Sequence, residues 1–531
     1  MRIVREGRNV YNGGVKEKAG TAVSLKKRRR MKVNSKAFRT GPPPPEGSTL
    51  KAVCDPDKPA KAKIVCRTPG SGKSRIKPFS QERSFPMPKK IVFIGSGSLV
   101  FTRNLVRDLL PFEAFRDAEI ALVDINETNL ALSKKAVDGI VEKGNYPARV
   151  TATVDRRQVL SGADGVVTTI CCGTNRDLYN DIAIPESYGC SINIGDTRGP
   201  SAVFRFLRTL YPMLDILRDI EELCPSALWL NYTNPMAMLC RALQGSTDTV
   251  TISGLCHSVQ GTAAMLCGFI GAPRDEVTYL CAGLNHQAHY LKFDWNGKDA
   301  IPLIRKAIVE SEEIYNKEQV RNEMFLHLGY YATESSGHNS EYSWWFRKRP
   351  DLIEKYCTHG TNWNPGHDAL ERKRAVMDET TEERHRREFG NFDIAAFPLD
   401  RGEEYAAYIF NAVFGDNEMF HFNGNVRNFG LIDNLPAGCC VEVPVLASKR
   451  GLEPIHVGAL PPQLAALNNI SAACEELAVA GGLERDPQKI YWSCLYDPLT
   501  AAVCSMAEIQ EMVGRLFEAN RDWLPGWTKF N

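Results

Sequence analysis

Two glycines that follow a strand-like apolar run could form the turn of a phosphate site. The run 91–94 leads directly into Gly95-Ser96-Gly97-Ser98, and an amphipathic segment, 99–110, comes next. A tight turn without side chains lets backbone N–H groups approach a pyrophosphate, which then lies at the positive end of the following helix. Although the usual third glycine is absent, the pattern predicts a dinucleotide site formed by Gly95, Gly97 and Ser98.

A carboxylate at the end of the next apolar run supports this prediction. The run 120–123 is typical of a buried strand and ends on Asp124, 29 residues after Gly95. A carboxylate in this part of a dinucleotide site binds the ribose hydroxyls, and the usual spacing is about 20 residues. An acidic group there favours NAD over NADP, so the two motifs together predict that the protein binds NAD.

Three further polar residues each follow a strand-like segment: Asn234 after 227–230, Cys256 after 250–255 and His286 after 277–283. Because the carboxyl ends of parallel strands meet at one edge of a sheet, where ligands bind, we expect these side chains to lie close together. A thiolate and an imidazole suit a divalent cation such as Mn, Fe, Co, Ni or Zn. Taken alone, Cys256 is more often a small buried apolar residue and His286 a hydrogen-bonded core residue, so both interpretations stand at this point.

The segments that carry these residues alternate between strand and helix patterns. Strands are expected at 91–94, at 120–123, near Val150, near Val166, at 227–230, at 250–255 and at 277–283, and helices at 99–110, 127–141 and 202–223. This alternation predicts an α/β fold with a Rossmann-type doubly wound sheet.

The pattern becomes mixed beyond about residue 300. A charged helix is expected at 378–387, an aromatic loop around Trp344-Trp345, and C-terminal helices such as 501–515. This part is expected to form a mixed α+β domain for catalysis and oligomerisation.

Length and charge divide the chain into parts. At 531 residues it exceeds one small domain, and residues 1–86 hold 22 Lys or Arg against 6 Asp or Glu, a net +16. The whole chain carries +2, so the remaining 445 residues carry −14. We expect a basic, disordered extension at 1–86, an NAD-binding domain at 87–283 and a substrate and metal domain at 284–531.

The basic extension has two interpretations. Its charge suits a nucleic-acid-binding or targeting tail. Alternatively, translation begins at Met87, three residues before the first strand-like run, and the extension takes no part in function. We favour the second interpretation, so nucleic-acid binding is not expected.

Apolar runs and cysteines bear on the cellular compartment. No run of about 18 apolar residues indicates a membrane span, and no apolar stretch near the N-terminus indicates a signal peptide. The 16 cysteines are scattered through apolar segments and include the vicinal pairs Cys171-Cys172 and Cys439-Cys440. Since such pairs do not suit ordinary disulfides, we expect reduced thiols and a cytoplasmic protein.

Several separated motifs in one order resemble glycoside hydrolase family 4. They are Asn231-Tyr232-Thr233-Asn234-Pro235-Met236, Gly254-Leu255-Cys256-His257-Ser258-Val259-Gln260-Gly261, Gly283-Leu284-Asn285-His286, Gly424-Asn425-Val426-Arg427-Asn428 and Asp433-Asn434-Leu435-Pro436. The resemblance extends from about Lys89 to Trp527. Within the family it is closest to the melibiase-type α-galactosidases, notably at 256–261, 333–336 and 439–443.

The resemblance implies a glycosidase that uses NAD and a divalent metal, usually Mn²⁺, on a small-molecule α-galactoside. In that family a hydride passes from sugar C3 to NAD, the resulting ketone acidifies the C2 proton, and the aglycone leaves by elimination before water and the hydride return. Family alternatives are an α-galacturonidase and a 6-phospho-α-glucosidase. A lactate- or malate-type dehydrogenase is the rival outside the family, and it would produce stoichiometric NADH. Relatives are commonly homodimers or homotetramers.

The same resemblance implies a role for each site residue. Cys256 and His286 correspond to the metal ligands, Tyr342 to the base at C2, His257 to the general acid, Asp196 to a contact with metal-bound water or substrate, and Asn234 and Arg427 to substrate-binding residues. Phosphoglucosidase members carry an aspartate where this chain has His257, whose imidazole can still protonate a leaving oxygen. A nearby metal charge is expected to lower the pKa of Tyr342. Relatives often have Leu in place of Arg198 and Gly-Gly in place of Ser201-Ala202, so the family's local substrate contacts are not carried over to this chain.

Overall fold

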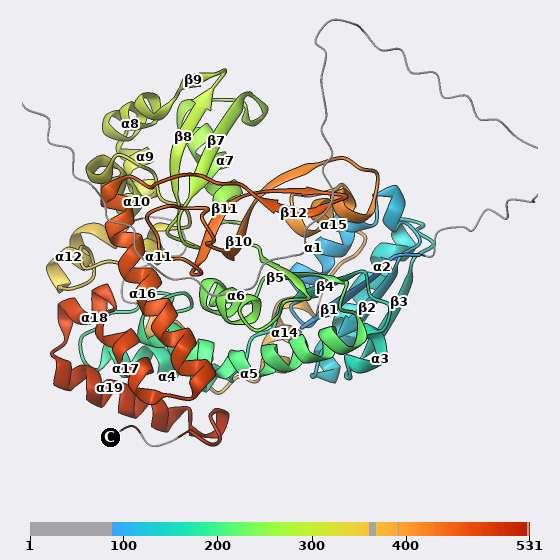
Figure 1. The fold of residues 1–531 in the computed structure, drawn as a ribbon, viewed down its shortest axis with the longest axis horizontal. Helices are drawn as coiled ribbons and strands as arrows, with labels where there is room; N and C mark the ends of the chain where they lie inside the picture. Colours follow the sequence, from blue (N-terminus) through green and yellow to red (C-terminus); the bar gives the residue numbers. More distant parts are fainter. Residues whose placement is uncertain (1–87, 360–367, 391, 528–529, 531) are drawn as a thin grey trace, which may run out of the picture. The chain divides into compact units, whose positions relative to one another are not determined.

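A computed structural model describes residues 88–359, 368–390, 392–527 and 530 (Figure 1). These residues belong to one unit of the structure. The predictions made for the extension 1–86 lie outside the described residues. No helix in the described ranges combines the length and apolar character that a membrane span needs.

Nine strands form the main sheet of the described chain, in the order β12-β11-β10-β6-β5-β4-β1-β2-β3. Their bounds are β1 Lys90–Ile94, β2 Glu119–Val123, β3 Arg149–Thr153, β4 Gly165–Thr168, β5 Leu228–Asn231, β6 Thr251–Gly254, β10 Phe420–Arg427, β11 Cys440–Ser448 and β12 Gly451–Pro454. The strands β1 to β6 are parallel in the order 3-2-1-4-5-6. This is the Rossmann order, so the predicted doubly wound sheet is confirmed.

Helices cover both faces of this sheet. Ile91 and Phe93 lie in one core with α1, α2 and α15, whereas Val92 and Ile94 lie in another with α5, α6 and α19. Successive side chains of a strand point to opposite faces, which explains the two cores. The covering helices are α1 Leu99–Leu109, α2 Glu127–Lys143, α5 Gly199–Leu223, α6 Met236–Gln244, α15 Tyr405–Phe414 and α19 Met506–Ala519.

The segment 277–283 departs from its expected place. It forms β7, Val277–Ala282, in a second, antiparallel sheet with β8, His289–Trp295, and β9, Lys298–Asp299. Figure 1 shows this sheet with α8 beside it. An isolated bridge between Gly283 and Glu442 joins the end of β7 to β11 of the main sheet, so the loop after β7 still arrives beside the end of β6.

The helices beyond residue 300 follow the mixed pattern expected there, with two differences. The predicted helix 501–515 is wrong, because α18 ends at Val503 and α19 begins at Met506, where Ser505 and Glu508 form a capping box. The charged helix begins at Thr381 rather than Asp378 because Thr380 and Glu383 form another capping box. The other helices are α3 Arg157–Leu160, α4 Asn175–Glu186, α7 Ser258–Ile270, α8 Ile301–Glu310, α9 Glu312–Lys317, α10 Gln319–Leu328, α11 Ser336–Asn339, α12 Pro350–Tyr356, α13 Asp368–Ala375, α14 Thr381–Phe389, α16 Pro462–Glu484, α17 Pro487–Leu495 and α18 Pro498–Val503.

The two predicted domains share the main sheet. Strands β10 to β12 come from the second predicted domain and extend the parallel strands of the first through an antiparallel contact between Asn425 and Gly254. The division at residues 283 and 284 stays a prediction.

Candidate functional site

The turn after β1 is built almost entirely from backbone. The N–H groups of Gly95 and Ser96 donate to the carbonyl of Val123 at 2.9 and 3.0 Å, and the Gly97 N–H donates to Asp124 Oδ2 at 2.8 Å. A Cβ on Gly97 would lie 2.5 Å from that carboxylate oxygen, so no larger residue fits without displacing it. The turn brings the predicted glycines and Asp124 together.

This turn lies where the strand order reverses. Strand β1 pairs with β2 on one side and β4 on the other, and nucleotides bind at the carboxyl edge of such a switch point. Gly95, with φ +85°, lies against the segment that leaves β4: a Cβ there would come within 2.8 Å of Ile170. Helix α1 begins immediately afterwards, and its N-cap residue Ser98 makes no side-chain cap, which leaves the helix N-terminus open to an anion.

Cys256 and His286 meet although their strands belong to different sheets. Cys256 Sγ lies 3.1 Å from His286 Nε2, and a carboxylate oxygen of Glu334 lies 3.4 Å from the same nitrogen. The three ligand atoms fall within 4.8 Å of one another. Thiolate, imidazole and carboxylate together form a donor set for a divalent transition metal, so these residues fit such an ion.

Two of these three residues have a left-handed backbone. His286 has φ +61° and Glu334 has φ +67°, a conformation that costs a non-glycine residue roughly 1–2 kcal/mol. Surrounding contacts must impose it, and residues held in this way gather at functional sites. In this conformation, the side chains of His286 and Glu334 both lie next to Cys256.

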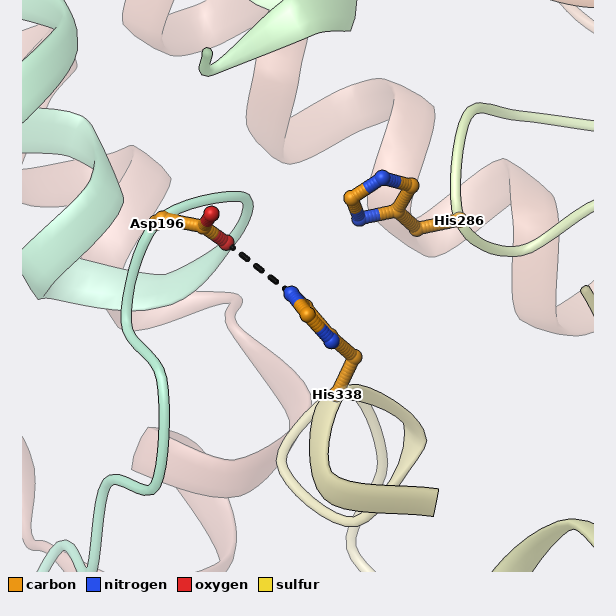
Figure 2. A group of neighbouring side chains, drawn as sticks. All are labelled: Asp196, His286 and His338. Atoms are coloured by element: carbon orange, nitrogen blue, oxygen red, sulfur yellow. Dashed lines mark ion pairs between the residues drawn. The ribbon is translucent and has the colours of Figure 1, made fainter. Parts of the chain in front are cut away.

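Asp196 and His338 form a second group with His286, and Figure 2 shows the three side chains pointing toward one another from separate segments. His338 Nε2 lies 3.4 Å from Asp196 Oδ1. Burial alone would raise the pKa of Asp196, but the hydrogen bond and charge of His338 hold it well below its usual range. Burial alone would lower the pKa of His338, but the carboxylates of Glu334 and Asp196 raise it to about 9.

Tyr342 is buried beside this cluster. Its hydroxyl lies 3.3 Å from His286 Nδ1, and the Arg198 guanidinium lies 4.9 Å from the centre of its ring. Burial raises the pKa of Tyr342 well above its ordinary value, and the charge of Arg198 opposes that rise. The expected lowering by a metal charge stays a prediction.

His257 and Asn234 complete the group. His257 Nε2 lies 2.6 Å from Glu404 Oε2, next to the first turn of α15. Burial alone would lower the pKa of His257, but the hydrogen bond to Glu404 raises it. Asn234 Nδ2 donates to Asp196 Oδ2 at 3.4 Å, which links the loop after β5 to the group formed by Asp196, His286 and His338.

Arg427 is not brought to this site. Strand β10 runs antiparallel to β6 with Asn425 opposite Gly254, so Arg427 lies toward the amino end of β6 while Cys256 lies beyond its carboxyl end. The Arg427 side chain instead donates to the Gly438 carbonyl. The role of Arg427 in binding the substrate stays a prediction, and the position of Arg427 in the structure does not support it.

The structure adds three residues that the sequence analysis did not single out: Glu334, His338 and Glu404. Glu334 and His338 lie four residues apart, as do His338 and Tyr342. This spacing of a carboxylate, an imidazole and a phenol is the sequence feature from which Glu334 and His338 could have been predicted. Glu404 had no such feature, because it meets His257 from 147 residues away in the chain.

Comparisons with known proteins show the family of this chain. The family 4 glycosyl hydrolase model matches residues 90–271, and the model of the family's C-terminal domain matches residues 281–500. An alpha-galactosidase of Bacillus subtilis (strain 168) is 36% identical over 440 residues, which covers 82% of this chain and 99% of the relative. An alpha-galactosidase of Rhizobium meliloti (strain 1021) is 35% identical and covers 83% of this chain and 90% of the relative.

A solved structure shares the fold. It is a 6-phospho-alpha-glucosidase from gut microorganisms, in complex with NAD and Mn²⁺, with a TM-score of 0.68 at 19% identity. The match covers 83% of this chain and all of that chain.

Proposed function

The chain belongs to family 4 of the glycosyl hydrolases, and from this premise we propose that it cleaves α-galactosides with the help of NAD and a divalent cation such as Mn²⁺. The observation that supports an α-galactoside as the substrate is the sequence identity of 35–36% with two alpha-galactosidases over more than four fifths of the chain. The meeting of Cys256, His286 and Glu334 supports the cation.

The residues present fit both groups. Gly95, Gly97 and Ser98 would hold the pyrophosphate of NAD, and Asp124 its ribose hydroxyls. Cys256, His286 and Glu334 would hold the cation. Bound NAD would supply a hydride acceptor and donor, and a bound cation would supply positive charge that stabilises an enolate.

Protein side chains carry the proton transfers in this proposal. Tyr342, as the phenolate that the charge of a bound cation would favour, takes the proton from sugar C2 once C3 is a ketone, the aglycone leaves by elimination across C1 and C2, and His257 protonates the departing oxygen. Water then adds across the double bond. Asp196 and Asn234, which contact each other, hold the sugar hydroxyls. Because the hydride returns to C3, NAD is needed only in catalytic amounts.

We also propose that the enzyme is cytoplasmic and assembles as a homodimer or homotetramer. Family resemblance supports the assembly. Within the family, α-galacturonides and 6-phospho-α-glucosides are the alternative substrates.

The test is cleavage of p-nitrophenyl α-galactoside under reducing conditions, with NAD and Mn²⁺ together and with each omitted in turn after chelation. We expect cleavage only when both are present and no accumulation of NADH. Parallel reactions with an α-galacturonide and a 6-phospho-α-glucoside test the alternatives. Cleavage without NAD would contradict the mechanism, and cleavage of only an alternative substrate would contradict the assigned sugar.

A further inference from the structure

A buried carboxylate ties together the two loops that carry Asp196 and Tyr342. Glu341 Oε2 accepts hydrogen bonds from the N–H groups of Asn193 and Ile194 at 2.7 and 2.9 Å, and Oε1 accepts one from Gly195 at 2.9 Å. Only 5% of Glu341 is exposed. The three donors immediately precede Asp196 in the chain, and the acceptor immediately precedes Tyr342.

The loop that is held in this way has no regular secondary structure of its own. Residues 190–195 lie between α4 and α5 without helix or strand, so their N–H groups need partners from elsewhere. Gly195 adopts φ +70°, and a Cβ there would lie 2.9 Å from Ser201 at the start of α5. Hydrogen bonds to an ionised carboxylate are about twice as strong as those between neutral groups, so one side chain can fix this turn.

A second buried side chain holds the same two segments together. Arg347 Nε donates to the Ser191 carbonyl at 2.9 Å, and Nη2 donates to Ser191 Oγ at 2.8 Å. Only 1% of Arg347 is exposed. The two ends of segment 341–347, Glu341 and Arg347, therefore both hydrogen-bond to segment 191–195.

We propose that Glu341, with Arg347, is a positioning residue that holds Asp196 against His338 and Tyr342. The proposal rests on the proposed glycosidase function, because that function makes Asp196 and Tyr342 part of the reaction. Glu341 touches neither the sugar nor a cofactor in this proposal. It acts by fixing the distance between two loops that are about 145 residues apart in the chain.

The test compares Glu341→Gln, Glu341→Asp and a matched control, Asp486→Ala. The control removes another carboxylate that accepts a backbone N–H, because Asp486 caps α17 by accepting from Gln488 at 2.9 Å. We expect Glu341→Gln to lower kcat by about 10²-fold, the scale of a misplaced catalytic group, with KM changed by less than about threefold. Glu341→Asp, which keeps the charge, recovers part of the loss. Asp486→Ala keeps the wild-type kcat.

Hydrogen exchange provides a readout that needs no activity. The peptide spanning 191–197 exchanges faster in Glu341→Gln than in the wild type and keeps its wild-type rate in Asp486→Ala. If Glu341→Gln does not fold, Arg347→Lys is expected to give the same two changes. Unchanged exchange at 191–197, or a kcat no lower than that of Asp486→Ala, would overturn the proposal. A wild type that cleaves no glycoside would instead refute the proposed function, and the exchange rates would still decide whether Glu341 holds the loop.

Discussion

His257 is the residue proposed as the general acid, in place of the aspartate that the family resemblance implies for phosphoglucosidases. Its Nε2 lies 2.6 Å from Glu404 Oε2, and its ring packs beside the aromatic rings of Tyr232 and Phe101, with centroids 5.7 Å away in both cases. With Nε2 engaged and the ring packed, Nδ1 is the nitrogen left to face a leaving group. The contact with Glu404 therefore supports the proposed role of His257 as general acid.

Replacing His257 tests this role through the leaving group. A general acid contributes about 10²–10⁴-fold to the rate when the leaving oxygen needs a proton. We expect His257→Asn to lower kcat/KM within this range for methyl α-galactoside and much less for p-nitrophenyl α-galactoside, whose phenolate leaves without protonation. Glu404→Gln should show the same preference with a smaller loss. Equal losses on both substrates would contradict the assignment.

Much of the candidate site could be predicted because its residues belong to local motifs. Cys256, His286, Asn234, Asp196 and Tyr342 were all predicted, and the structure brings them together. Motif reasoning could not find Glu404, because its contact with His257 depends on how α15 packs. The position of Arg427 away from the other site residues was not predictable either, because the antiparallel direction of β10 is a tertiary property that the local sequence does not encode.

At the level of elements, the glycine turn between β1 and α1 is tightly constrained. Its geometry depends on the contact between the Gly97 N–H and Asp124 and leaves no space for a side chain. Gly97→Ala is expected to weaken NAD binding at least about tenfold, because the new methyl group must displace the Asp124 carboxylate or Asn129. Titration of the protein with NAD, followed by calorimetry, measures this.

Gly514→Ala is the matched control for that prediction. Gly514 lies in α19, and no atom lies within 4 Å of a Cβ built on it. We expect this variant to keep the wild-type affinity for NAD and to gain stability, because alanine is the better helix former by roughly 1 kcal/mol. Equal NAD affinities in Gly97→Ala and the wild type would show that the glycine turn does not bind NAD.

The strands and helices of the Rossmann part were predictable to within a few residues, since their apolar periodicity is strong. The capping boxes at Thr380 and Ser505 explain the helix boundaries that were missed, and both follow the pattern Ser/Thr-x-x-Glu, which is visible in the sequence. The membership of β7 in a second sheet was not predictable. Strand patterns describe burial along a segment and say nothing about which strand will pair with it.

At the scale of the whole molecule, two distant parts of the chain build one site. The Rossmann strands supply the glycine turn and Cys256, whereas the later loops supply His286, Glu334 and Tyr342. All of these residues lie within one unit of the structure. The basic extension at 1–86 contributes none of the site residues predicted from the sequence, and its role stays a prediction.

The central claim is that cleavage proceeds by removal of the proton on C2 rather than by direct hydrolysis. The most direct measurement is cleavage of an α-galactoside in D₂O with NAD and Mn²⁺, followed by return of the galactose to H₂O and analysis by NMR and mass spectrometry. Acid hydrolysis in D₂O is the matched control, and its product should keep hydrogen at C2. We predict that galactose released by the enzyme carries one deuterium at C2. Enzymatic release of galactose with hydrogen still at C2 would contradict the mechanism.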